Sequence, residues 1–127
     1  MDKILAEISA GELIDKITIL EIKKEKISSK EKLVEVNKEL NSLNETLKKT
    51  INDENKIINF KNDLKNINLK LWDIEDGKRL AEKNNKFDER FIELSRSVYK
   101  FNDERAKIKL AINNALGSNI KEVKYYE

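Results

Sequence analysis

Apolar residues recur along this chain at alternating intervals of three and four positions, the spacing that places side chains on one face of an α-helix. The longest such seam runs from residue 87 to residue 115 and includes a single charged member. Its members are Phe87, Phe91, Leu94, Val98, Phe101, Arg105, Ile108, Ile112 and Ala115. A second seam, between residues 57 and 83, consists of Ile57, Phe60, Leu64, Ile67, Leu71 and Ile74. These heptad-like patterns predict two long amphipathic helices.

The first half of the chain carries two shorter seams that are out of step with each other. The first consists of Leu13, Ile17, Leu20 and Ile27, with Ile14, Ile19 and Ile22 beside it, and the second consists of Leu33, Val36, Leu40, Leu43 and Leu47. Because the first stripe is wide, we expect its helix to contact more than one neighbour. Six positions separate Ile27 from Leu33, where a continuous seam needs seven, and Ser28-Ser29 lies in the gap. A full turn there, with Ser29 as N-cap, gives four helices, whereas a kink gives three.

Local signals mark the other helix ends. Ser9 followed by Glu12 forms a capping-box pattern, so the first helix is expected to start at about residue 10. The polar run 52–55 predicts a turn. Asn84-Asn85 and Gly117 are suited to the left-handed conformation that often ends a helix.

The two ends of the chain, residues 3–8 and 120–125, alternate partly between apolar and polar positions and are expected to form short strands. Four antiparallel helices would bring these strands to the same end of one molecule. Three helices would separate them, and pairing would then need an antiparallel homodimer. We therefore expect an all-α fold: an antiparallel bundle of long helices, or coiled-coil-like hairpins, with three long or four helical segments and short terminal strands.

Composition narrows the classes of function. The 127 residues fit one helical domain, 1–127, and include neither Cys nor His. Disulfides, thiolate metal sites and a histidine base are therefore excluded, and we expect neither a metal nor a cofactor. The 26 basic and 24 acidic residues nearly cancel, so nucleic acid is not an expected partner. No apolar run approaches the length of a membrane span and no secretory signal is visible, so we expect a cytoplasmic protein.

Arg105 is the charged residue of the last seam, and a buried charge must be neutralised or must reach water. One interpretation is a structural ion pair that fixes the helix register, with Asp15, Glu21 or Asp76 as the carboxylate. The other is an anion-binding arginine at the base of a small pocket.

Other polar and aromatic residues offer further candidates. A stripe on the face away from the last seam consists of Arg96, Tyr99, Lys100 and Asp103, with Lys107 beyond them. It is either a solvated surface with ion pairs within the helix or a recognition surface, because Arg and Tyr are common in binding hot spots. Trp72, the single Trp, either packs against the first helical segment or forms an exposed patch with Leu69.

Three segments resemble a small family of bacterial and phage proteins without an assigned function. They read GELIDKITILEIK from residue 11, LWDIED from residue 71 and RSVYKFNDERAKIK from residue 96. The polar and aromatic motif positions fall here on Glu12, Asp15, Lys16, Thr18, Glu21, Trp72, Asp73, Glu75, Asp76, Arg96, Tyr99, Lys100, Asn102, Asp103 and Arg105. A motif rich in polar residues favours a site or a partner surface over packing alone. The resemblance also implies a link to surface-polysaccharide or glycan metabolism.

These observations favour a non-enzymatic helical interaction module over an enzyme. We expect it to bind a protein partner or an anionic small molecule through Glu12, Asp15, Trp72, Arg96, Tyr99, Lys100, Asp103 and Arg105. The alternative is a small helical-bundle enzyme or sensor for a phosphorylated or carboxylated metabolite such as a nucleotide sugar. In that case Arg105 and Lys100 would clamp the anion, and Asp15 or Glu75 would be the acid–base residue. Nucleic-acid binding would need a one-sided basic face, which the mixed helices lack.

Overall fold

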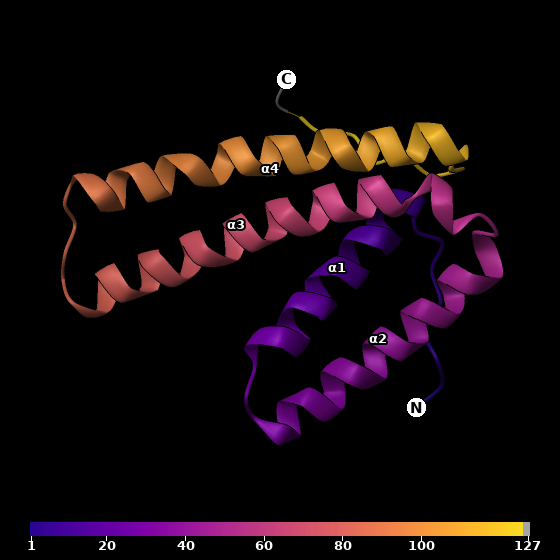
Figure 1. The fold of residues 1–127 in the computed structure, drawn as a ribbon, viewed down its shortest axis with the longest axis horizontal. Helices are drawn as coiled ribbons and strands as arrows, with labels where there is room; N and C mark the ends of the chain where they lie inside the picture. The colour runs from indigo at the N-terminus through magenta and orange to yellow at the C-terminus, as the bar shows by residue number, and fades with distance from the viewer. Residues whose placement is uncertain (126–127) are drawn as a thin grey trace.

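The computed structural model describes residues 1–125 and consists of helices joined by short turns (Figure 1). Its elements are α1 (Ala10–Lys26), α2 (Lys30–Thr50), the 3₁₀ turn η1 (Glu54–Lys56), α3 (Ile58–Lys83) and α4 (Glu89–Leu116). The all-helical prediction is confirmed. Of the two alternatives left open by the sequence, the one with four helical segments is correct.

The helix breaks fall where the sequence places them. The Ser29 hydroxyl accepts a hydrogen bond from the backbone N–H of Lys32 at 3.4 Å, so residues 28–29 form a full turn. The Ser9 hydroxyl caps α1 by accepting from the N–H of Glu12 at 3.1 Å. Asn85 and Gly117 adopt the left-handed conformation, with φ of 53° and 64°. These caps satisfy backbone groups that a helix end leaves without a partner.

The helices form two hairpins, α1–α2 and α3–α4 (Figure 1). The hairpins are joined by α1, which packs against both helices of the second hairpin. Helix α1 packs against α2, α3 and α4, whereas within the described residues α2 packs against no helix but α1. The wide apolar stripe of α1 is thereby explained, since three helices cover it. The buried core is formed by Leu13, Ile14, Ile17, Leu20, Val36, Leu40, Leu47, Ile57, Leu64 and Ile112.

The distal half of the α3–α4 hairpin extends well past the α1–α2 hairpin, so that part consists of two helices alone (Figure 1). Gly77 lies where these helices approach closely. A Cβ atom on it would lie 3.0 Å from Cδ1 of Leu94. At the tip, Phe87 precedes α4 and packs edge-on against Phe91, with ring centroids 5.3 Å apart.

The prediction of terminal strands is wrong, because residues 1–125 contain no strand. The start of α1 and the end of α4 do lie near each other, since the Ser118 hydroxyl accepts from the N–H of Ala10 at 3.1 Å. Beyond this point, however, the C-terminal segment runs along α4 and is held by two ion pairs. Glu122 bonds Lys109 at 2.7 Å and Lys124 bonds Asp103 at 2.6 Å.

These ion pairs determine which way the C-terminal segment faces. Alternation puts the charged side chains of residues 122 and 124 toward α4. The apolar Val123 and Tyr125 are then turned to solvent, with 89% and 90% of their surface exposed. Within residues 1–125, no helix is both long and apolar enough to cross a bilayer.

Candidate functional site

A network of charged and amide side chains joins α1, α3 and α4 around Asp15. This residue is fully buried on the central helix. Arg105 on α4 donates from Nε to Asp15 Oδ1 at 3.0 Å and from Nη2 to Oδ2, so the pair is bidentate. Asn68 on α3 donates from Nδ2 to the same Oδ1 at 2.9 Å. Asp15 is therefore the partner of Arg105, and not Glu21 or Asp76, the other two candidates.

Helix α3 is tied to α1 by a second bond of the Asn68 amide. Its Nδ2 also donates to Thr18 Oγ1 at 2.9 Å, and the Thr18 hydroxyl donates to the carbonyl of Asp15 at 2.8 Å. The amide position is therefore set by two acceptors on one helix. Such closed sets of bonds fix a polar group in place inside a core.

Lys109, one helical turn beyond Arg105, forms the second half of the network. Only 8% of its side chain is exposed, and its ammonium lies 2.7 Å from carboxylate oxygens of both Glu12 and Glu122. It also lies 3.9 Å from Asp15 Oδ2. Burial acts to lower the pKa of Lys109. The hydrogen bonds to Glu12 and Glu122 and the charge of Asp15 outweigh it, so the pKa is raised.

The pKa of Arg105 is raised as well. The largest cause is its hydrogen bond to Asp15, which burial partly opposes. Both cations therefore remain charged and are neutralised by carboxylates of the same chain.

Close contact between α1 and α4 completes this region. The backbone N–H of Gly11 donates to Asn113 Oδ1 at 2.7 Å, and Asn113 is 1% exposed. A Cβ atom at residue 11 would lie 2.5 Å from the carbonyl oxygen of Lys109. The glycine is needed here because the α4 backbone occupies the space of a side chain.

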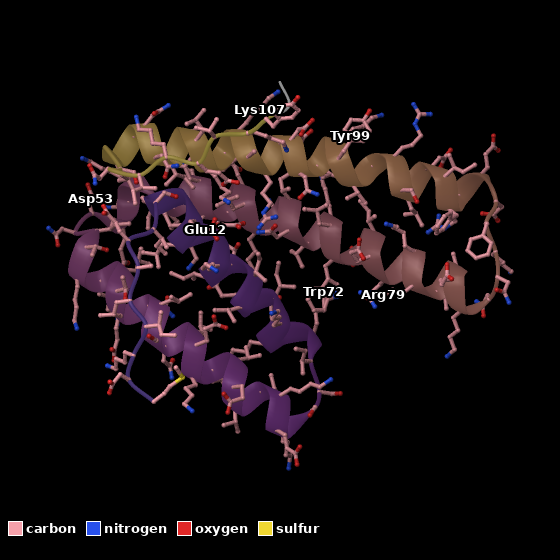
Figure 2. All side chains as sticks on the ribbon, turned by 180° about the vertical axis from the view of Figure 1, so that it is seen from behind. Glu12, Asp53, Trp72, Arg79, Tyr99 and Lys107 are labelled. Atoms are coloured by element: carbon pink, nitrogen blue, oxygen red, sulfur yellow. The ribbon has the colours of Figure 1, made fainter. Side chains whose placement is uncertain are left out.

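Two open grooves lie beside the network, and both are lined by Val98, Asn102 and Arg105. The first, which we call the Trp72 groove, has a volume of about 430 Å³ and lies between α1, α3 and α4. Its lining also includes Ile19, Ile22, Asn68, Leu71, Trp72, Glu75, Asp76 and Arg79. In Figure 2, Trp72 and Arg79 project from the side of α3 that faces the α1–α2 hairpin.

The second groove, which we call the Tyr99 groove, has a volume of about 820 Å³ and lies between α4 and the C-terminal segment. Its lining also includes Tyr99, Asp103, Ala106, Lys109, Glu122, Val123, Lys124 and Tyr125. Figure 2 shows Tyr99 and Lys107 on the edge of α4 that faces away from α3. Volumes of a few hundred Å³ with mixed polar and apolar walls are typical of small-molecule sites.

Comparison with known proteins gives a family. Residues 4–127 match the model of a family of unknown function, DUF6165. The chain belongs to this family. No curated protein and no solved structure matches it. The function of DUF6165 is unknown, as the sequence motifs implied, so the chemistry of this member must be inferred from its own side chains.

The structure separates the predicted site residues into three groups. Glu12, Asp15 and Arg105 meet in the buried network. Trp72 lines the groove on the α1 side of α3. The stripe residues lie on the outer face of α4, where Arg96 and Lys100 are exposed, Tyr99 is 57% exposed and Asp103 is bonded by Lys124. Arg105 connects these places, because it belongs to the buried network and also borders both grooves.

The sequence reasoning missed several residues that complete the network: Gly11, Asn68, Lys109, Asn113 and Glu122. One signal for Lys109 was available, since it lies four positions after Arg105 and so on the same helix face. Within residues 1–125, no three Asp or Glu side chains are grouped closely enough to hold a metal ion.

Proposed function

We propose that this protein is a non-enzymatic binding module that takes its ligand in the Trp72 groove. The observation that carries the proposal is the convergence in one groove of an aromatic ring, two amides and a guanidinium, from Trp72, Asn68, Asn102 and Arg105. Residues of this kind at a concave surface are typical of binding sites. The network behind them holds Asn68 and Arg105 in place before any ligand arrives.

Bonds within the network favour binding over catalysis. The carboxylate of Asp15 accepts hydrogen bonds from Arg105 and Asn68. The Lys109 ammonium forms ion pairs with the carboxylates of Glu12 and Glu122. A general acid or base must lie within hydrogen-bond reach of the substrate group with which it exchanges a proton. The charged groups of the network are instead bonded to one another. They act as the support of the groove.

The alternative, an enzyme or sensor for a phosphorylated or carboxylated metabolite, receives less support. It requires Arg105 and Lys100 to clamp one anion. The charge of Arg105 is neutralised by Asp15, and Lys100 lines neither the Trp72 groove nor the Tyr99 groove. The outer stripe of α4 remains a candidate surface for a protein partner. A role in surface-polysaccharide or glycan metabolism, which the sequence resemblance implies, would be compatible with either surface.

The test is a binding screen that uses Trp72 as reporter, since it is the single Trp in the chain. Nucleotides, nucleotide sugars, neutral sugars, di-acids and short peptides are screened by thermal shift and by intrinsic fluorescence. A ligand at about 100 times its Kd adds about 2.7 kcal/mol of stability, worth several degrees in Tm. We expect at least one compound to shift both signals.

A matched pair of variants locates the site. Trp72→Ala should abolish the Tm shift, whereas Phe87→Ala, which removes an exposed aromatic ring at the hairpin tip, should retain it. A ligand that binds Trp72→Ala as tightly as the wild type would place the site elsewhere. Chemical conversion of a bound compound would overturn the non-enzymatic assignment.

A further inference from the structure

The Trp72 groove contains an accessible hydrogen-bond acceptor that the fold leaves unused. Asn68 is 6% exposed, and its Nδ2 is bonded to Asp15 and Thr18. Among the described residues, none donates to its Oδ1. No fully enclosed side-chain polar atom lacks a partner in residues 1–125, so this oxygen must reach solvent. The opening that Asn68 lines is the Trp72 groove.

Hydrogen-bond donors of Arg105 lie close to the side-chain amide of Asn68. Arg105 Nε and Asn68 Nδ2 bond the same oxygen of Asp15, at 3.0 and 2.9 Å, so the two nitrogens are separated by no more than the sum of these distances. Arg105 Nη1 makes a long contact of 3.5 Å with Asn102 Oδ1. Within the described part of the chain, Asn102 Nδ2 donates to no residue. The groove therefore presents an unused acceptor together with two donors that still have a free N–H, Asn102 Nδ2 and Arg105 Nη1.

Charge restricts what these groups can recognise. Arg105 is neutralised by Asp15. Of the other charged residues that line the groove, Glu75 and Asp76 are acidic and Arg79 is basic. Arg79 Nε lies 4.0 Å from Glu75, with 83% of its side chain exposed. The groove thus has no excess of positive charge, and a phosphate or carboxylate would gain little there.

Resting on the proposed function, we propose that the ligand is a neutral pyranose sugar. Each ring hydroxyl both donates and accepts a hydrogen bond, so neighbouring hydroxyls can donate to Asn68 Oδ1 and accept from Asn102 Nδ2 or Arg105 Nη1. The C–H groups of the ring provide the apolar surface that Trp72, Leu71 and Val98 can cover. A phosphate dianion has only acceptors, so the phosphate group of an ester cannot donate to Asn68 Oδ1.

The test is a side-chain NMR titration of the ¹⁵N-labelled full chain. The probes are the methyl glycosides of glucose, galactose, mannose and N-acetylglucosamine, added to roughly 50 mM, which covers weak millimolar affinities. We expect at least one glycoside to shift the Asn68 and Asn102 amides and the Trp72 indole N–H with one saturation curve. Glucose 6-phosphate should bind no more tightly than the matching neutral glycoside.

Variants that retain the fold test whether the NMR shifts arise from binding in the Trp72 groove. Asn102→Ala should weaken binding about fivefold, which corresponds to the loss of one hydrogen bond. Asn66→Ala removes an exposed amide of α3 outside the groove lining and should leave binding unchanged. Trp72→Ala should weaken binding at least tenfold, and Trp72→Phe should restore most of it.

The outcomes separate this inference from the proposed function. If the glycosides leave all three signals unmoved while a peptide or other compound shifts them, the pyranose is wrong and the binding groove stands. Tighter binding of glucose 6-phosphate would overturn the neutral-ligand argument. If a glycoside binds Trp72→Ala and wild type equally, both proposals fail for this groove.

Discussion

Arg105 and Asp15 form a bidentate ion pair although they lie 90 positions apart in the sequence. The pair joins the last helix to the first and places a guanidinium between two grooves. Its two members differ in exposure, since 28% of the Arg105 side chain but only 1% of the Asp15 side chain is accessible. Loss of the arginine is therefore the more costly change, because the carboxylate that remains has little access to water.

We expect Arg105→Ala to lower the free energy of unfolding by about 3–5 kcal/mol, the range found when one member of a buried pair is removed. Asp15→Asn should cost less, because Arg105 can turn toward solvent. Urea denaturation measures both. Arg96→Ala, at an exposed position of the same helix, is the control and should change stability by less than about 0.5 kcal/mol. An Arg105→Ala protein as stable as this control would show that the pair is not structural.

Two glycine substitutions should differ sharply in their effect on the free energy of unfolding. In Gly11→Ala the new Cβ would lie 2.5 Å from a backbone oxygen of α4, so the helices must separate, and we expect a loss of about 1–3 kcal/mol. In Gly77→Ala the nearest atom is a flexible Leu94 methyl at 3.0 Å, and the gain in helix propensity of about 1 kcal/mol offsets the crowding. Denaturant midpoints compare the two. Equal losses would contradict the close approach of α1 and α4.

The raised pKa of Lys109 predicts a loss of stability at high pH. A group whose pKa is higher in the folded chain stabilises the fold fully below its unfolded pKa, and ceases to do so as the pH rises through the folded value. For Lys109 the unfolded value is the ordinary 10.5, so its contribution should be constant up to that pH and decline above it. Unfolding free energies of wild type and Lys109→Met, measured from about pH 8 to pH 11.5, should therefore converge only at the alkaline end. A constant difference would show that the pKa is not raised.

The C-terminal segment should detach without loss of the helical fold. Glu122→Gln combined with Lys124→Ala removes the two ion pairs that hold it on α4. The Lys124–Asp103 pair is largely exposed and should contribute about 0–1 kcal/mol. Lys109 keeps Glu12 and Asp15 as carboxylate partners when Glu122 is replaced, so Tm should change little. Backbone order parameters of residues 119–125 should fall below about 0.6. Lys121→Ala, at the exposed position next to Glu122, is the control and should leave the segment ordered. Equal order in the double variant would mean that other contacts hold it.

Much of the helical layout was predictable because its signals are local. Ser9, Ser29, Asn85 and Gly117 each mark a helix end through bonds or dihedral angles that depend on adjacent residues. A charged residue in an apolar seam must be neutralised, and the sequence could therefore list the carboxylates available to Arg105. It could not select Asp15, since the choice depends on how α1 crosses α4.

The incorrect or missing predictions also concern contacts between residues that are distant in the sequence. Alternation near the C-terminus predicts a strand, but the neighbour available to this segment is a charged face of α4. Glu122 and Lys124 therefore face the protein in place of the apolar residues. The position of Lys109 on the same helix face as Arg105 is a weak signal, because the chain is rich in lysine and most lysines are solvated. The Trp72 groove depends on the spacing of the two hairpins, and the Tyr99 groove depends on the path of the C-terminal segment. No local pattern determines either.

The central position of α1 has a consequence for how the chain is made. Helix α1 is synthesised before α4, yet the groups that satisfy Asp15 and the N–H of Gly11 belong to Arg105 and Asn113, 90 and 102 positions further along the chain. While only α1, α2 and α3 have emerged from the ribosome, the buried carboxylate of Asp15 lacks its cation. Contacts this distant in sequence are slow to form, so the nascent chain should stay open to chaperones and proteases until α4 has also emerged.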